Sequence, residues 1–299
     1  MKPTPSLAAP PADAGIGRLF EIAFGGHTRP FRWQSKFAAG PWPAVLNAPT
    51  GSGKTAGVTL AWIRDRLGRP ETTPRRLVWC LPMRTLVDQT AREVRGWLDH
   101  LHNEGIDPGH LLPRADDVHI LMGGADSGRW FENPERPAVI VGTQDMLLSR
   151  ALMRGYASSR ASWPMEFAVL HRDCQWVFDE VQLMNAGRAT SAQLEAFRRA
   201  EFERARREDR PAGRPCRSLW ISATLKPEWL ETVDHPAPSN VMRVEPEAED
   251  DDRLRRLTEA AKHLQRARIG PATSNTGDHS NCSVRPWRAT DCADRGGVW

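Results

Sequence analysis

The segment 48–55, APTGSGKT, constrains the fold of this chain more than any other. It follows the apolar run 45–46, which favours a buried strand, and it precedes Leu60, Ile63 and Leu67 at helical spacing. A glycine-rich loop between a strand and a helix binds phosphate groups through its backbone N–H groups and the helix N-terminus. The sequence therefore predicts a nucleoside triphosphate site on an α/β sheet.

The residue types in this loop suit a triphosphate and its metal ion. Gly51 and Gly53 let backbone N–H groups turn toward phosphate oxygens, and Lys54 supplies a cation for the β- and γ-phosphates. Thr55 offers a hydroxyl to Mg²⁺, and Ala48 is small enough for the turn where the usual pattern has glycine. The expected cofactor-binding residues of the loop are Pro49, Thr50, Gly51, Ser52, Gly53, Lys54 and Thr55.

Composition bounds the class of protein. With 299 residues, 40% of them hydrophobic and 26% charged, the chain can build one large α/β domain or two ordinary ones. No run approaches the ~18 apolar residues of a membrane span, and residues 1–15 hold no apolar secretion segment. We therefore expect a cytoplasmic protein without membrane contact. The five cysteines match no zinc spacing and favour free thiols, and the net charge of +4 permits nucleic-acid binding without requiring it.

Six short apolar runs predict the strands of a sheet. Continuous hydrophobicity is typical of parallel strands that are buried on both faces. Helical spacing between the runs, at 87–101 and around 146–153, favours βαβ units and therefore a doubly wound α/β fold with helices on both faces. The predicted strands are 45–47, 77–81, 118–121, 138–141, 176–178 and 218–221.

Composition changes outside this region. We expect a disordered N-terminus at 1–15, a nucleotide-binding domain at 16–245, an acidic linker with an amphipathic helix at 246–268, and an unstructured, aberrant tail at 269–299. Because the tail holds few aliphatic residues, we expect the natural protein to continue differently after the helix. Arginines and carboxylates mix over 198–217, which is typical of a solvated helix and loop and also compatible with a polyanion-facing surface.

Carboxylates follow the fifth predicted strand. Asp179 and Glu180 come directly after the apolar residues 176–178, and we expect this strand end to lie beside the phosphate loop. One carboxylate can bind the hydrated metal ion while the other orients or deprotonates the attacking water. We assign Asp179 to Mg²⁺ and Glu180 to the attacking water, which makes Lys54, Asp179 and Glu180 the expected catalytic residues.

Small hydroxyl residues follow the sixth predicted strand in the same way. Such residues can hydrogen-bond the acidic loop and respond to its state. The residues expected to provide this coupling are Ser222, Ala223 and Thr224.

Taken in order, APTGSGKT, DEVQ and SAT resemble the first motor lobe of superfamily 2 helicases, and the resemblance covers about 25–268. It implies a RecA-like lobe with ATP and Mg²⁺ as cofactors. Gln34, in RPFRWQSKF, resembles the adenine-contacting glutamine of this superfamily, while its aromatic neighbours suit core packing equally well. LPMRTLVDQT, a glycine pair and VGTQDMLLSRAL resemble its nucleic-acid motifs. The residues they imply are Arg84, Thr85, Gly123, Gly124 and Thr143.

Within the superfamily, DEVQLMNAG, GTQDMLLSRAL and LPMRTLVDQT are most similar to the helicase of type I CRISPR interference. This implies an antiviral DNA helicase or translocase that acts on single-stranded DNA and is recruited by a CRISPR guide-RNA surveillance complex. The resemblance covers one lobe, without the second RecA-like lobe or the HD nuclease, so we expect this chain alone to be weak or inactive. A nucleotide-binding module without turnover and the motor lobe of a restriction enzyme or RNA helicase remain open alternatives.

Overall fold

The computed structural model describes residues 15–107, 109–124, 128–210 and 214–245, together with Leu254 and Arg256. All of these belong to the first of two compact units of the chain, Met1–Ala260, while the second lies outside the described residues. The predicted N-terminal disorder and the predicted tail also fall outside them. Leu254 and Arg256 are helical, and the rest of the predicted amphipathic helix is not among the described residues.

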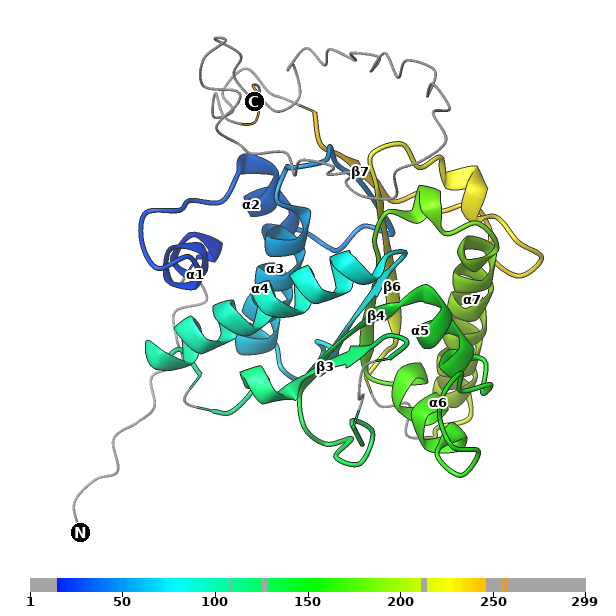
Figure 1. Ribbon diagram of the computed structural model, residues 1–299. Helices are drawn as coiled ribbons and strands as arrows, with labels where there is room; N and C mark the ends of the chain where they lie inside the picture. The colour runs from blue at the N-terminus through cyan, green and yellow to red at the C-terminus, as the bar shows by residue number, and fades with distance from the viewer. Residues whose placement is uncertain are drawn as a thin grey trace, which may run out of the picture. The chain divides into compact units, whose positions relative to one another are not determined.

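The described residues form a sheet of seven strands, all paired in parallel (Figure 1). The strand order is β3-β4-β2-β5-β6-β1-β7. All six predicted strands are confirmed, and the seventh, at the edge beside β1, was not predicted. The strands are β1 (Val45–Asn47), β2 (Arg76–Leu81), β3 (Val118–Leu121), β4 (Ala138–Thr143), β5 (Cys174–Phe178), β6 (Arg217–Ser222) and β7 (Val241–Arg243).

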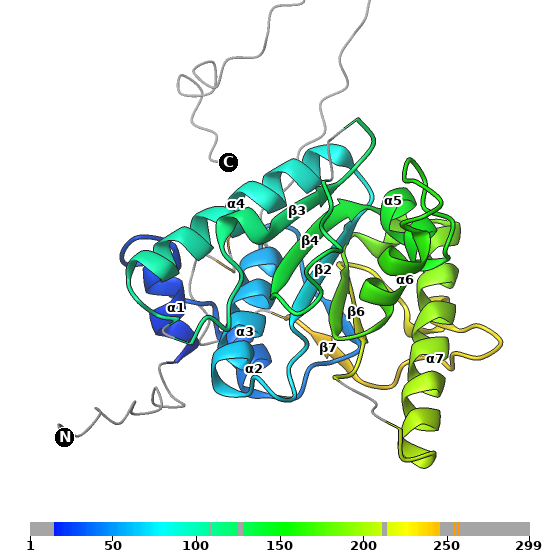
Figure 2. The same ribbon diagram turned by 90° about the horizontal axis from the view of Figure 1, so that it is seen from below.

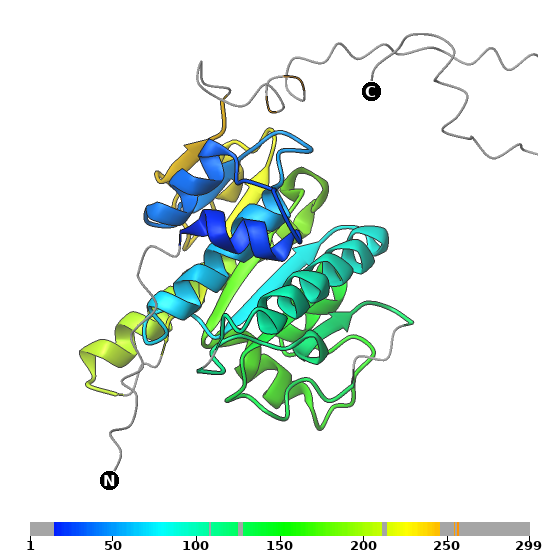
Figure 3. The same cartoon turned by 90° about the vertical axis from the view of Figure 1, so that its left-hand side faces the viewer.

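Helices cover both faces of the sheet, as predicted (Figures 1 and 2). The first group, which Figure 3 shows in front of the sheet, is α1 (Ile16–Ala23), α2 (Arg32–Ala39), α3 (Lys54–Gly68) and α4 (Arg84–Asn103). The second group is α5 (Gln144–Ala151), α6 (Trp163–His171) and α7 (Ala186–Arg207). Short 3-10 turns lie at Ala115–Asp117, Val181–Leu183 and Pro227–Leu230. This is the doubly wound architecture expected from the strand pattern, and it agrees with the RecA-like lobe that the resemblance implied.

Two apolar cores lie on the two faces of the sheet, and alternate residues of each strand enter them. On β2, Leu77 and Trp79 pack with α1–α4, whereas Val78 and Cys80 pack with α5–α7. All four are completely buried. Burial of each large apolar side chain contributes roughly 1.5–3 kcal/mol, so the unbroken apolar run stabilises both layers. A polar residue anywhere along such a strand would face one core or the other.

The arginine-rich segment departs from the prediction of a solvated helix and loop. α7 ends at Arg207, and most of its arginines are exposed, but Arg198 is only 4% exposed. Its guanidinium lies 4.6 Å from the ring centroid of Trp176 on β5. Periodicity within a charged run did not distinguish this buried position from its exposed neighbours.

Two predictions from composition can be compared with the described residues. Cys80, Cys174 and Cys216 are free thiols, as predicted, and the other two cysteines lie outside the described part. Among the helices that the structure describes, none combines the length and apolar character that crossing a membrane requires.

Candidate functional site

The loop between β1 and α3 turns at two glycines. Gly51 and Gly53 have φ angles of 82° and 73°, a left-handed conformation that glycine adopts without strain. A Cβ atom on Gly53 would lie 2.8 Å from Nε2 of Gln34. The first N–H groups of α3, which starts at Lys54, have no acceptor within the helix and can therefore bind an anion.

A pocket of about 430 Å³ opens over this loop. This volume lies in the range of sites for small molecules and nucleotides. Of the predicted residues, those that line it are Gln34, Gly51, Gly53, Lys54, Thr55, Asp179 and Glu180. Pro49, Thr50 and Ser52 do not line it, and Ser52 is fully buried with Oγ donating to the carbonyl of Pro49 at 2.7 Å. The loop therefore borders the pocket through Gly51, Gly53, Lys54 and Thr55.

Lining residues from α1, α4 and the α1–α2 connection were not predicted. They include Phe24, Thr28 and Arg29 before α2, and Glu93 and Trp97 on α4. The only sequence signal was the position of Arg29 close to Gln34, because the helical pattern of α4 indicated core packing alone.

Lys54 pairs with both predicted carboxylates. Its Nζ lies 3.0 Å from Oε1 of Glu180 and 3.8 Å from Oδ1 of Asp179. Burial is the main cause that raises the pKa of Asp179 to about 6; the charge of Lys54 opposes this rise and the charge of Glu180 adds to it. Glu180 has a φ of 51°, a left-handed conformation uncommon outside glycine. Backbone strain of this kind concentrates at functional sites.

Strand β6 lies between β5 and β1, so Asp179 does not follow a direct neighbour of the phosphate-loop strand. The intervening strand ends at Ser222, whose Oγ donates to Oε1 of Gln182 at 2.6 Å. Nε2 of Gln182 in turn donates to Oε2 of Glu180. Lys54, Glu180, Gln182 and Ser222 therefore form one hydrogen-bonded chain across three strand ends. Gln182 belongs to the DEVQ motif, but its role could not be predicted without knowing the strand order.

The other two predicted coupling residues are exposed. The backbone N–H of Thr224 donates to Oγ of Ser222 at 3.1 Å, so the turn supports the serine hydroxyl. Ala223 lies between them and contributes no polar side-chain atom. Of the three, Ser222 alone enters the hydrogen-bonded chain through its side chain.

Gln34 is buried beside the loop, with both ends of its amide engaged. Oε1 accepts from the backbone N–H of Phe31 at 2.7 Å, and Nε2 donates to the carbonyl of Gly53 at 2.9 Å. The amide oxygen can accept two hydrogen bonds and the NH₂ group can donate two, so one lone pair and one N–H remain. Gln34 therefore fixes the loop, and its contact with adenine stays a prediction.

The predicted nucleic-acid residues gather at the carboxyl ends of β2, β3 and β4. Arg84 and Thr85 begin α4 and are exposed, and a Cβ on Gly124 would lie 3.4 Å from Nη2 of Arg84. Gly123 precedes Gly124 after β3, and Thr143 ends β4 in register with the end of β2. The arrangement places these residues on the same edge of the sheet as the nucleotide pocket.

The oxygen donors in the pocket fit a magnesium nucleotide. Mg²⁺ prefers hard oxygen ligands and retains waters and phosphate oxygens, so one hydroxyl and one carboxylate are sufficient. Thr55 and Asp179 supply that pair, and Lys54 lies between the loop and the carboxylates.

Comparison with known proteins agrees with this site. The profile of the DEAD/DEAH box helicase family matches residues 39–233. A search of curated protein sequences gives no match. The DUF1998 helicase MrfA bound to DNA and AMPPNP shares 16% identity and a TM-score of 0.53, covering 79% of this chain and 30% of its own. The DEAD-box helicase Mss116 bound to ssRNA and UDP-BeF is 17% identical and aligns with a TM-score of 0.51. The alignment covers 78% of this chain and 43% of Mss116.

At these identities the solved structures show the fold alone, and this chain spans less than half of their length. The family profile carries more weight, because it matches more than half of the chain and includes the phosphate loop, the Asp179–Glu180 pair and Ser222. On that match, this chain belongs to the DEAD/DEAH box helicases.

Proposed function

We propose that this chain is the ATP-binding lobe of an ATP-dependent DNA helicase or translocase that serves CRISPR interference in the cytoplasm. The motor assignment is supported above all by the hydrogen-bonded chain from Lys54 through Glu180 and Gln182 to Ser222. It joins the nucleotide loop to a second strand end, which is what a nucleotide-driven switch requires. The CRISPR assignment rests on the resemblance of 81–90, 141–152 and 179–187.

In this proposal each predicted catalytic or metal-binding residue has one role. The N-terminus of α3 and Lys54 hold the β- and γ-phosphates, while Thr55 and Asp179 hold Mg²⁺. Glu180 orients the attacking water and takes its proton. The metal ion, when bound, neutralises charge that develops on the transferred phosphoryl group. Gln182 holds the second oxygen of Glu180, so the carboxylate keeps one orientation.

The nucleic-acid strand is proposed to cross the neighbouring edge of the sheet. Arg84 and Thr85 at the start of α4 suit a backbone phosphate, because a helix N-terminus and a guanidinium both attract it. The glycine pair Gly123–Gly124 and Thr143 would lie beside the same strand. MrfA was solved with DNA and Mss116 with ssRNA, so the choice of nucleic acid is the part of this proposal that experiment decides.

Turnover by this chain alone is proposed to be slow. Motors of this kind use cationic groups from another element to stabilise transition-state charge, worth about 10³–10⁵ in rate where an arginine finger acts. The matched structures extend well beyond the region they share with this chain. The surveillance complex that the resemblance implies as partner would contact the complete motor.

The test is ATP binding and phosphate release by the purified 299-residue chain, without nucleic acid, with single-stranded DNA and with single-stranded RNA. We expect ATP to bind, phosphate to be released slowly, and DNA to stimulate release more than RNA does. Stimulation by RNA alone would assign an RNA helicase. Binding without release under any condition would assign a nucleotide-binding module. Lys54→Ala should weaken binding strongly, and Lys226→Ala, at an exposed site, should not.

A further inference from the structure

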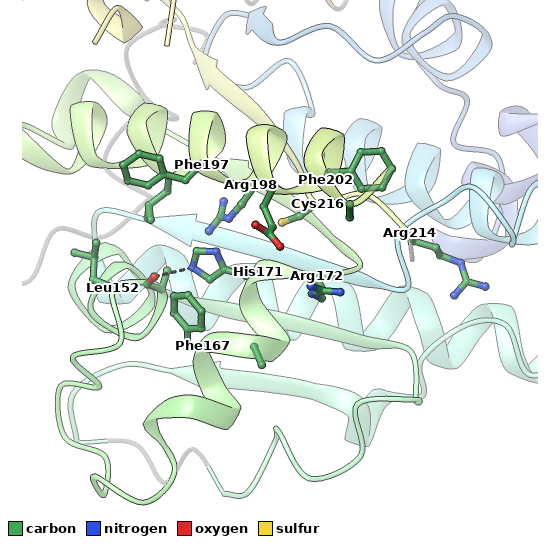
Figure 4. A pocket seen from close by; sticks show the side chains of 14 residues that line it. Leu152, Phe167, His171, Arg172, Phe197, Arg198, Phe202, Arg214 and Cys216 are labelled. Carbon is green, nitrogen blue, oxygen red and sulfur yellow. Dashed lines mark hydrogen bonds between the residues drawn. The ribbon is translucent and has the colours of Figure 1, made fainter. Parts of the chain in front are cut away.

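Another cavity, of about 550 Å³, lies among α5, α6 and α7. Figure 4 shows its lining side chains. It lies at the opposite edge of the sheet from the nucleotide pocket. Two of its lining residues lie at the amino ends of strands: Arg172 shortly before β5, and Cys216 directly before β6. The amino and carboxyl ends of parallel strands lie at opposite edges, so this cavity is separate from the pocket of Lys54. Its volume is that of a site for a small molecule.

The walls of the cavity are mostly apolar. Leu152 follows α5, Phe167 comes from α6, and Phe197 and Phe202 come from α7. Phe197 is 53% exposed and Leu152 is 49% exposed, so large apolar side chains line its mouth and remain in contact with water. Such walls favour a ligand with an aromatic or aliphatic body.

The most deeply buried charged side chain of the cavity is Arg198, which Figure 4 shows reaching from α7 toward His171 on α6. Arg198 is only 4% exposed, and all three of its guanidinium nitrogens lack a hydrogen-bond acceptor among the described residues. Contact with the Trp176 ring shields one face and leaves the N–H groups unpaired. A buried unpaired cation is strongly unfavourable, so an anion that reached it would gain charge-assisted hydrogen bonds.

The remaining charges of the cavity do not neutralise Arg198. Glu201 and Arg214 each form ion pairs with residues outside the cavity. Arg172 has no ion pair with a described carboxylate and adds to the positive potential. Burial, and then the charge of Arg198, lower the pKa of His171 to about 4, so its ring is neutral near pH 7. The cavity therefore favours an anionic ligand.

We propose that this cavity is a binding site for a small organic anion, a carboxylic acid with an aromatic or branched aliphatic body. The carboxylate accepts hydrogen bonds from Arg198, and the body packs between Phe167 and Phe197. Because the Arg198 nitrogens are shielded from water, side chains that line the cavity have to shift for the carboxylate to reach them. The site does not depend on the proposed reaction with ATP.

The test uses 2-naphthoate and the uncharged 2-naphthalenemethanol as probes, titrated into the 299-residue chain by calorimetry. We expect 2-naphthoate to bind at least about tenfold more tightly, because hydrogen bonds to a charged group contribute more than neutral ones. Arg198→Met should reduce its affinity to that of the alcohol. Arg199→Met, at the exposed neighbouring position of α7, should leave it unchanged.

A second variant keeps the test informative if Arg198→Met does not fold. Ala168 is exposed on α6 and lines the cavity, so Ala168→Trp should fill the cavity and remove binding of both probes without disturbing a core. Equal affinity for the two probes, no binding of 2-naphthoate, or binding retained in Ala168→Trp would overturn the proposal. So would displacement of 2-naphthoate by ATP, because that would place it in the nucleotide pocket.

Discussion

Ser222 and Gln182 are joined by a hydrogen bond of 2.6 Å between the serine Oγ and the glutamine Oε1. Ser222 is completely buried at the end of β6, and Gln182 stands in the 3-10 turn that follows Glu180. The bond links two strand ends that are 40 residues apart in the sequence. It is the step through which a change at Glu180 can reach the end of β6.

Loss of this bond should have a measurable energetic signature. Gln182→Ala and Ser222→Ala each remove one partner, and leaving the other unpaired in a buried site costs about 1–3 kcal/mol in free energy of unfolding. The double variant should cost less than the sum, with a coupling of about 0.5–3 kcal/mol. Urea denaturation of the four proteins gives these values. Strict additivity would show that the bond contributes nothing.

Lys54→Ala should weaken ATP binding about 10- to 100-fold, since a charge-assisted hydrogen bond contributes about 1.5–3 kcal/mol. Equilibrium binding of a fluorescent ATP analogue measures the change. Lys226→Ala, an exposed lysine beyond β6, is the matched control and should bind like the unmodified chain. Unchanged affinity in Lys54→Ala would remove Lys54 from the phosphate site.

The raised pKa of Asp179, about 6, should appear in the binding of Mg²⁺. A protonated carboxyl cannot hold the metal, so the Mg²⁺-dependent part of ATP affinity should fall below pH 6, approaching tenfold per pH unit. Titrations with and without Mg²⁺ between pH 5 and 8 isolate this part. The γ-phosphate of ATP also titrates in this range, so Asp179→Asn should reduce the pH dependence without removing it, and a profile that Asp179→Asn leaves unchanged would contradict the assignment.

The same pKa predicts how stability changes with pH in the absence of Mg²⁺. Between the ordinary value of 3.8 and the folded value of about 6, folded Asp179 retains a proton that the unfolded chain has released. The contribution of Asp179 to the free energy of unfolding therefore falls as pH rises through this window. Denaturation at intervals across it, compared with Asp179→Asn, isolates this contribution. The free energy of unfolding should therefore fall less steeply with pH in Asp179→Asn than in the unmodified chain. A steeper fall in Asp179→Asn would contradict the explanation.

Gly53→Ala should destabilise the chain by roughly 1–3 kcal/mol, because alanine is strained at positive φ and its Cβ would approach Nε2 of Gln34. Gly96, inside α4, is the control, since a Cβ there meets nothing within 4 Å. Gly96→Ala should stabilise by about 0.5–1 kcal/mol through helix propensity. Thermal denaturation of both variants compares the two glycines. Equal effects would show that the loop backbone is not constrained.

Arg84→Ala should weaken binding to nucleic acids of every sequence. It should also reduce the slope of log affinity against log salt concentration by about 1, the amount expected for one phosphate contact. Fluorescence anisotropy of labelled single-stranded DNA at several salt concentrations measures both. Arg92→Ala, exposed two turns further along α4, is the control for simple loss of charge. If both variants change binding equally, Arg84 acts through general charge and not through a specific contact.

The sequence predicted the strands better than their arrangement. Buried parallel strands have unbroken apolar runs, so the five interior strands were recognisable, and so was β3 at one edge of the sheet. β7 is Val241–Arg243, three partly exposed residues that show no period. The position of β6 between β5 and β1 depends on long-range pairing, and no local pattern contains it. The role of Gln182 follows from that order and could not be predicted without it.

Residue types predicted the nucleotide pocket because its chemistry is local. One loop supplies the phosphate cradle, and two consecutive carboxylates supply the acidic side. Arg198 shows the limit of such reasoning: its charged neighbours favoured solvent, and its contact with Trp176 depends on packing against β5. Arg29 was missed for the same reason, since its place over the loop follows from how α1 and α2 dock.

The pairing of Lys54 with Glu180 at 3.0 Å has a consequence for timing. The Lys54 ammonium has three N–H donors, and phosphate oxygens that reach it compete with Glu180 for them. In the proposed mechanism, arrival of the nucleotide would therefore loosen the contact of Lys54 with Glu180 and leave that carboxylate freer to act on water.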